Sequence, residues 1–262
     1  MSEKPLILVA NDDSYNAPGV HALVERMALL GDVVAVCPAS PQSGQSMAIT
    51  VNSPLFVKEL GDFHGAQGYA VSGTPVDCVK LAMHHILPRT PQLVVAGINH
   101  GSNASVNVLY SGTMGAVMEG CAFGIPSIGF SLCNHSLDAD FGHCLPAVDH
   151  LAKAVLEHSL PPGICLNVNF PKVAASPSAM RLCTPCRGKW NDEYQKYTDP
   201  HGHPYYWLTG VFENEEPENE ATDQWSLEHG LISVVPVSIG RTPGDVADIP
   251  WLADSLRSYN DR

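Results

Sequence analysis

Two adjacent aspartates, Asp12 and Asp13, follow a short apolar run and are well placed to do chemistry. The run, residues 6–10, has no polar face, which is typical of a central strand in a parallel sheet that helices cover on both sides. Ligands of open α/β sheets bind at the carboxyl ends of the strands, so both carboxylates lie where a ligand is expected. Adjacent carboxylates repel each other unless a cation compensates them, which favours a metal site. This pair alone supports equally well a helix cap at Asp13 and a solvated Asp12.

Two later loops bring further oxygen donors toward the same predicted edge of the sheet. Ser43 lies in a polar loop after a second apolar strand, residues 33–38, whereas Asn99 and Asn103 follow a third, residues 92–97. Taken singly, Ser43 is more simply a loop hydroxyl and the two asparagines are more simply turn residues. Their convergence on one edge favours a site for a hard cation such as Mg²⁺ or Mn²⁺, because such cations prefer oxygen ligands.

A helix start built from small residues is a candidate phosphate site. Ser111, Gly112 and Thr113 begin a predicted helix over residues 110–124. Backbone N–H groups at such a start, together with the helix dipole, bind anions without a cationic side chain, and the loops described above contain no Lys or Arg. A plain N-cap by Ser or Thr is an equally good explanation. Gly112 nevertheless favours the close approach of a ligand or of another part of the backbone.

Three other residues carry weaker signals. His100 follows Asn99 and is placed to act as a general acid or to contact a substrate, although simple solvent exposure explains it equally well. Cys183 and Cys186 form a lone CxxC motif, and without a second pair of cysteines a zinc or redox site is not favoured.

Alternating strands and helices position these residues. Apolar runs predict strands over residues 6–10, 33–38, 92–97, 126–132 and 164–170, with two shorter strands at 54–60 and 68–73 around a turn at 61–65. Helical periodicity predicts helices from Pro18 to about Gly31 and over residues 75–87, 110–124 and 145–160. This order predicts a doubly wound α/β protein with a mostly parallel sheet. No GxGxxG follows the first strand, so the dinucleotide-binding fingerprint is absent.

The chain changes character after about residue 171. Aromatic residues concentrate at 190–207, where segments 194–200 and 204–210 predict a long hairpin, and a strand is expected at 231–237 after an acidic run. We therefore expect a catalytic core over residues 1–180 and a C-terminal part over residues 181–262, which contains a hairpin arm and a closing strand. A lone hairpin cannot bury its aromatic side chains, so either the core or a neighbouring subunit must cover them. We expect the neighbouring subunit to do so, because polar and acidic stretches flank the arm.

Composition excludes several classes of partner. The formal net charge of −13 disfavours polymeric nucleic acid and an anionic membrane surface. The first apolar stretch is too short for a signal peptide, and no stretch approaches membrane-spanning length. We therefore expect a cytoplasmic protein whose eight cysteines are reduced thiols.

Taken together, five ordered motifs resemble those of the SurE family, the stationary-phase survival protein nucleotidases. They are NDD at 11–13, PQSG at 41–44, SGTPVDCV at 72–79, GINHGSN at 97–103 and YSGT at 110–113. Thr222-Asp223 and GLISVVP at 230–236 extend the resemblance toward the end of the chain. Each motif is weak by itself, but the ordered set is highly specific.

The resemblance implies a metal-dependent phosphatase that hydrolyses nucleoside monophosphates at the 5′ or 3′ position. It also implies a Rossmann-like core, one divalent cation per subunit, most simply Mg²⁺ or Mn²⁺, and a homodimer or homotetramer assembled through C-terminal arms. Carried over by position, the metal ligands are Asp12, Asp13, Ser43 and Asn99, and the phosphate or substrate residues are Asn11, Asn103, Ser111, Gly112 and Thr113. Ser14 departs from the family, which usually has Gly after the aspartates, so this position is expected to need an unusual backbone angle.

The interpretation that combines these signals is phosphate ester hydrolysis by a metal-activated water. Asp12 is expected to bridge the metal and the nucleophile, and Asp13 to act as a second ligand. An aspartyl-phosphate phosphatase is a second interpretation, but it needs acids two residues apart, whereas these two are adjacent. A third is a non-catalytic nucleotide-sensing protein with the same fold.

Overall fold

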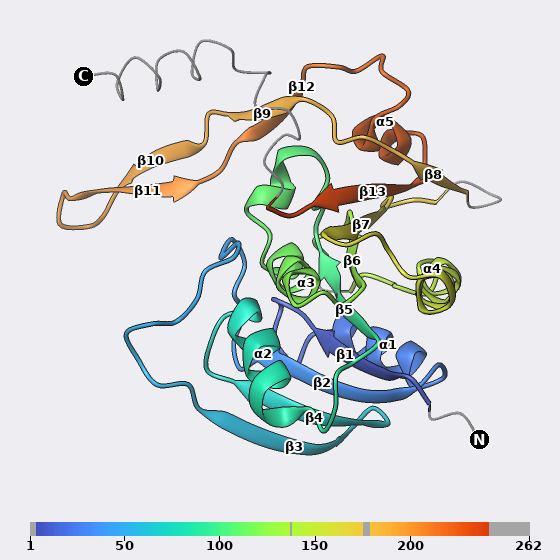
Figure 1. Ribbon diagram of the computed structural model, residues 1–262. Helices are drawn as coiled ribbons and strands as arrows, with labels where there is room; N and C mark the ends of the chain where they lie inside the picture. Colours follow the sequence, from blue (N-terminus) through green and yellow to red (C-terminus); the bar gives the residue numbers. More distant parts are fainter. Residues whose placement is uncertain (1–3, 137, 175–178, 241–262) are drawn as a thin grey trace, which may run out of the picture.

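The apolar runs of the sequence form the centre of a nine-stranded sheet (Figure 1). The computed structural model describes residues 4–136, 138–174 and 179–240. The strands lie in the order β3-β4-β2-β1-β5-β6-β7-β13-β8. The five predicted core strands are β1 (Leu6–Ala10), β2 (Asp32–Pro38), β5 (Leu93–His100), β6 (Ser127–Leu132) and β7 (Ile164–Phe170). They are parallel to one another, and all five residues of β1 are buried, as expected for a strand between two layers of helices.

Two pairs of helices cover the two faces of the sheet. One apolar cluster contains α1 (Pro18–Met27) and α4 (Leu145–His158), and the other contains α2 (Pro75–Leu81) and α3 (Gly112–Ala122). The predicted helix over residues 75–87 is α-helical only to Leu81 and continues as a π-helical turn (Ala82–Ile86). The doubly wound, mostly parallel α/β fold predicted from the sequence is confirmed.

The small hairpin beside β2 differs in detail from the prediction. Strand β3 (Val57–Phe63) extends into the segment 61–65 that was expected to form the turn. The chain reverses later, at His64 and Gly65, before β4 (Ala66–Val71). Both turn residues have positive φ, 53° and 84°, which is the conformation that a tight hairpin turn requires. Gly61 lies within β3, directly after a bulge that follows Glu59, instead of in the turn.

The C-terminal part returns to the core sheet and also forms the arm. Strand β13 (Ile232–Ser238) pairs antiparallel with β7 and parallel with the short β8 (Met180–Leu182). Strands β9 (Gly188–Asn191) and β12 (Val211–Asn214) form the base of the arm, and β10 (Tyr194–Thr198) with β11 (Pro204–Leu208) forms its tip. Four elements here were not predicted: β8, β9, β12 and α5 (Asp223–Glu228).

The tip of the arm projects away from the sheet (Figure 1). All residues of β10 and β11 are exposed, and Trp207 keeps 63% of its surface accessible. The aromatic residues of the tip are therefore not buried against the described core of their own chain.

No helix in the described part of the chain is long and apolar enough to cross a membrane.

Candidate active site

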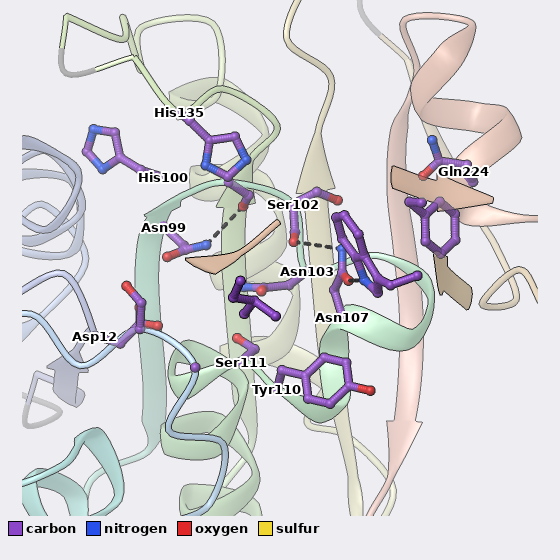
Figure 2. Close-up of a pocket in the computed structure, with 16 residues that line it drawn as sticks. Asp12, Asn99, His100, Ser102, Asn103, Asn107, Tyr110, Ser111, His135 and Gln224 are labelled. Carbon is purple, nitrogen blue, oxygen red and sulfur yellow. Dashed lines mark hydrogen bonds between the residues drawn. The ribbon is translucent and has the colours of Figure 1, made fainter. Parts of the chain in front are cut away.

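A cavity of about 570 Å³ opens at the carboxyl ends of β2, β1 and β5 (Figure 2). Five of the predicted site residues line it: Asp12, Ser43, Asn99, Asn103 and Ser111. Of the other predicted residues, Asp13 contacts His100 and Thr113 contacts Asp12, both of which line the cavity. Asn11 and Gly112 adjoin the lining residues Asp12 and Ser111 in sequence. The three strand-end loops and the start of α3 thus meet at one edge of the sheet, where open α/β proteins bind ligands.

Asp12 is buried at the bottom of the cavity and is held by the start of α3. Its carboxylate accepts a short hydrogen bond from the Thr113 hydroxyl and another from the Thr113 backbone N–H. Only 4% of Asp12 is exposed. Burial and the neighbouring Asp13 charge raise the pKa of Asp12 to about 6, although the bonds from Thr113 act in the opposite direction. The site is therefore electrostatically unfavourable for two bare carboxylates.

Asp13 has a different partner, namely His100 at the end of β5. The Asp13 Oδ2 atom accepts a hydrogen bond from the His100 backbone N–H at 3.1 Å and lies 3.3 Å from Nδ1 of the same ring. The ring packs edge-on against Phe141, with 5.0 Å between the ring centres. His100 thus joins the end of β5 to the loop after β1. Asp13 is not the N-cap of α1: that position is Ala17, and it has no side-chain cap hydrogen bond.

Asn99 and Ser43 provide neutral oxygens near Asp12. The Asn99 amide nitrogen donates to the Gly101 carbonyl at 2.9 Å, and its amide oxygen faces the side of the cavity where Asp12 lies (Figure 2). Ser43 is exposed at the rim of the cavity. The Gln42 backbone N–H donates to the Asp12 carbonyl at 2.7 Å, which ties the Ser43 loop to the loop after β1.

Asn103 is anchored in a buried polar network beneath the cavity. Its side-chain amide donates to the Ser131 hydroxyl at 2.8 Å, and its backbone N–H donates to the Asn169 side chain at 2.8 Å. Asn167 donates in turn to the Asn103 carbonyl at 2.8 Å. Because β6 and β7 supply these partners, the position of Asn103 is fixed by strands that do not themselves reach the Asp pair.

The start of α3 lies directly against Asp12. Ser111 is the N-cap, and its Oγ accepts a hydrogen bond from the Met114 backbone N–H at 3.0 Å. A Cβ atom at Gly112 would come within 2.9 Å of the Asp12 Cβ and 3.2 Å of the Gln42 carbonyl oxygen. Gly112 is therefore required for close approach to the Asp12 loop, and Thr113 contacts Asp12 at the same point.

The loop after β1 also contains the unusual backbone angle that was expected at Ser14. Ser14 has φ of 78°, in the left-handed region where glycine is favoured. Its carbonyl accepts a hydrogen bond from the Asn11 side chain at 2.7 Å, so Asn11 stabilises the turn. The Asn11 Oδ1 atom is buried and has no partner within the described ranges.

Several residues that line the cavity were not identified from the sequence. Asn107 and Tyr110 come from the 3₁₀ helix (Ser105–Leu109) and its end, and His135 follows β6. The arm and α5 supply the remaining wall: Trp190, Leu208, Phe212 and Gln224. The residues from the arm and α5 are distant in sequence from the strand-end loops. The sequence signals near them were the concentration of aromatic residues after position 171 and the Thr222-Asp223 motif.

Asp223 fixes this second wall. It is fully buried, and its carboxylate accepts hydrogen bonds from the backbone N–H groups of Ser105 at 2.7 Å and Cys186 at 2.9 Å. Burial raises the pKa of Asp223 above its ordinary value, while these hydrogen bonds act in the opposite direction. The base of the arm is therefore attached to the 3₁₀ helix by a buried side chain.

The donor set around Asp12 suits a hard cation better than zinc. It consists of carboxylate, amide and hydroxyl oxygens, and among the described residues that line the cavity there is no Lys or Arg to balance the two carboxylates. No group of three or more His, Cys, Asp or Glu side chains in the described chain could hold a metal. Cys183 and Cys186 are buried free thiols, and Cys183 Sγ lies 3.2 Å from the Ser226 hydroxyl.

Comparison with known proteins identifies relatives over nearly the whole chain. The family model described as survival protein SurE matches residues 7–192. A protein of Phocaeicola vulgatus named 5′-nucleotidase SurE is 49% identical over 92% of this chain and 93% of its own length. One of the same name from Chlorobaculum tepidum is 40% identical over 92% of this chain and 91% of its own length. The crystal structure of SurE protein from Aquifex aeolicus superposes with a TM-score of 0.81 at 34% identity, covering 95% of this chain and 100% of that one.

Proposed function

The chain belongs to the SurE family, and from this membership we propose that it is a 5′-nucleotidase, which hydrolyses nucleoside monophosphates to nucleoside and phosphate. The observation that carries the proposal is the meeting of Asp12, Asn99 and the start of α3 in one cavity. This arrangement combines oxygen ligands that suit a cation with a helix N-terminus that suits a phosphate, and both features support phosphate ester hydrolysis.

The carboxylate end of the cavity would hold one divalent cation, Mg²⁺ or Mn²⁺. Asp12, Asp13, Ser43 and Asn99 are the proposed ligands, and the all-oxygen chemistry of this set fits such an ion. Two neighbouring carboxylates without a Lys or Arg among the described lining residues also favour a cation there. When bound, the cation would polarise the phosphoryl oxygens and lower the pKa of a coordinated water.

The chain itself supplies orientation and charge stabilisation. Thr113 holds the Asp12 carboxylate, and the paired contacts from His100 hold Asp13. The Ser111 hydroxyl and the Gly112 N–H at the start of α3 are proposed to bind phosphate, with Asn11 and Asn103 supporting the loops on the same side. Thr113 already donates to Asp12, so its contribution to phosphate binding would be indirect in this arrangement.

We further propose that the enzyme is a homodimer or homotetramer and works in the cytoplasm. The exposed tip of the arm supports assembly, because its aromatic residues are uncovered in the single chain. In this proposal residues 1–180 form the catalytic core, while residues 181–262 provide assembly and the closing strand. The eight free cysteines support a reducing compartment.

Phosphate release from a panel of 5′- and 3′-nucleoside monophosphates tests the function. The protein is first treated with EDTA, and single metals are then added back. Activity is expected to depend on Mg²⁺ or Mn²⁺. Asp12→Asn is expected to abolish most turnover and to weaken metal binding, and to raise the melting temperature of the metal-free protein because it removes a buried charge. Asp32→Asn, at the exposed start of β2, is the matched control.

Three outcomes would contradict parts of this proposal. Full activity of Asp12→Asn, or activity insensitive to EDTA, would exclude the proposed metal site. Tight, metal-dependent nucleotide binding without turnover would favour a nucleotide sensor. A trapped phosphoaspartate on Asp12 would favour the aspartyl-phosphate chemistry instead.

A further inference from the structure

We propose that Trp190 forms the wall on which the base of the nucleotide stacks, and that this gives the enzyme a preference for purines. The inference rests on the proposed nucleotidase function and names the part of the substrate that the second wall of the cavity recognises. Trp190 lies on β9 at the base of the arm and lines the same cavity as Asp12.

The two ends of the cavity differ in chemistry. Figure 2 shows Asp12 and Asn99 at one side, Asn107 and Gln224 at the other, and Ser111 between them. Trp190 belongs to the Asn107 side, because its indole N–H donates to the Asn107 Oδ1 at 2.9 Å. A substrate whose phosphate lies at the Asp12 end would therefore extend its nucleoside toward the indole. The cavity volume of about 570 Å³ lies in the range of sites for small organic ligands.

The indole is held in place on more than one side. Trp190 is the cross-strand partner of Phe212, and the two rings meet edge to face with 5.9 Å between their centres. Gly188 makes this packing possible, since a Cβ atom there would come within 2.3 Å of the Phe212 ring. Asp223 also fixes the chain around β9 through the Cys186 N–H. A rigid aromatic wall stacks a base with little loss of side-chain entropy.

The indole N–H of Trp190 is already used in a hydrogen bond, and this limits how the ring can recognise a base. Because Nε1 already donates to Asn107, the ring offers the cavity aromatic surface and no hydrogen-bond donor. Stacking on such a surface accepts any base but favours those with the larger π system. We therefore expect AMP and GMP to be better substrates than CMP and UMP.

The test compares a substrate that has a base with one that lacks it. The Michaelis constants for AMP and ribose 5-phosphate are measured for the wild type, Trp190→Ala, Trp190→Leu and Trp190→Phe, each in the presence of the divalent cation that supports activity. Trp190→Ala and Trp190→Leu are expected to raise the constant for AMP by roughly tenfold and to leave that for ribose 5-phosphate nearly unchanged. Trp190→Phe should retain most of the affinity for AMP, and the advantage of purines over pyrimidines should shrink in Trp190→Leu.

Trp225→Ala is the matched control, because Trp225 stacks on His229 at 3.8 Å and does not line the cavity. Equal losses on AMP and ribose 5-phosphate would overturn the inference, as would an unchanged constant for AMP in Trp190→Leu. Trp190→Leu keeps an apolar side chain, so it decides the question where Trp190→Ala fails to fold. A wild type that hydrolyses no nucleotide would contradict the proposed function instead. In that case, calorimetric titration of the same two ligands into wild type and Trp190→Leu tests the stacking by itself.

Discussion

At the scale of residues, the two aspartates are neighbours in sequence but have separate supports. Asp12 is buried and held by Thr113 from α3, whereas Asp13 is held by His100 from β5. Each carboxylate is thus oriented by a different layer of the molecule. Because their hydrogen-bond partners differ, two adjacent acids can both be placed at one site without sharing a partner.

His100 is expected to position Asp13 for metal binding. His100→Ala removes the ring contact to Asp13 Oδ2 but keeps the backbone hydrogen bond, and substitutions of this kind typically weaken metal affinity by about 10–100-fold. His100→Asn offers a side-chain donor and should recover part of the affinity. Calorimetric titration with Mn²⁺ measures the effect, and melting temperatures in EDTA show whether the fold has changed. Equal Mn²⁺ affinity in His100→Ala and wild type would exclude this role.

Some site residues could be predicted from the sequence because their positions follow from strand ends. Asp12 and Asn99 come directly at the carboxyl ends of apolar strands, and parallel strands bring their ends together. Trp190 and Gln224 could not be placed in the same way. Their positions in the cavity depend on how the distant arm and α5 fold back onto the core, which no local pattern specifies.

At the scale of elements, the start of α2 joins a long loop to the core. Thr74 and Asp77 form a capping box, and Asp77 also accepts hydrogen bonds from the Thr50 backbone N–H at 3.0 Å and hydroxyl at 2.6 Å. Burial acts to raise the pKa of Asp77, but the hydrogen bonds from Thr50 and Thr74 outweigh it and hold the pKa below its ordinary value.

Asp77→Asn is expected to lower stability by roughly 0.5–2 kcal/mol at pH 7, because it removes charge from the cap. The pKa is lower in the folded protein than in the unfolded chain, so ionised Asp77 stabilises the fold above pH ~4. That contribution is lost as the pH falls through the folded-state pKa. The difference in the free energy of unfolding between wild type and Asp77→Asn should therefore narrow below about pH 4. Urea unfolding at a series of pH values measures it, and a difference that is constant with pH would argue against an ionised cap.

The predicted elements are specified by their own local sequence, whereas those that were not predicted depend on contacts with distant parts of the chain. Strand β1 and the first four residues of β5 are continuous apolar runs that are buried on both faces, so composition alone identifies them. Strand β8 has only three residues and alternates between exposed and partly exposed positions, and α5 has only six. Such short elements form because β13 and Asp223 hold them, and this depends on tertiary contacts.

At the scale of the whole molecule, the arm divides into two parts with different surroundings. Its base, β9 with β12, lies over the cavity through Trp190 and Phe212. Its tip, β10 with β11, is exposed on every residue and reaches the cavity only through Leu208, the last residue of β11. Each exposed aromatic side chain has about 150–250 Å² of surface that a partner could cover. The proposed assembly therefore uses the tip, and the proposed base recognition uses the base of the arm.

Removing only the tip separates these roles. Tyr194 pairs with Leu208, and the Thr209 N–H donates to the Glu193 carbonyl at 2.7 Å. An Asn-Gly turn can therefore replace residues 195–207, which closes a shorter hairpin and keeps Leu208 in the cavity wall. The deletion is expected to lower the oligomeric state while β9 and β12 stay in place. Light scattering of the purified protein measures the mass. As a milder variant, Tyr206→Ser with Trp207→Ser keeps the hairpin and removes part of its exposed apolar surface. A soluble deletion of unchanged mass would show that assembly does not use the tip.

The position of β13 has a consequence for synthesis of the chain on the ribosome. This strand pairs with β7 on one side and β8 on the other, although the whole arm and α5 lie between β7 and β13 in the sequence. At translation speeds of about 5–20 residues per second, the edge of β7 waits several seconds before β13 emerges to pair with it. During that interval the nascent chain carries an uncovered strand edge, which other chains can pair with. Nascent chains that stop before residue 232 would keep this edge and are expected to be retained by holding chaperones.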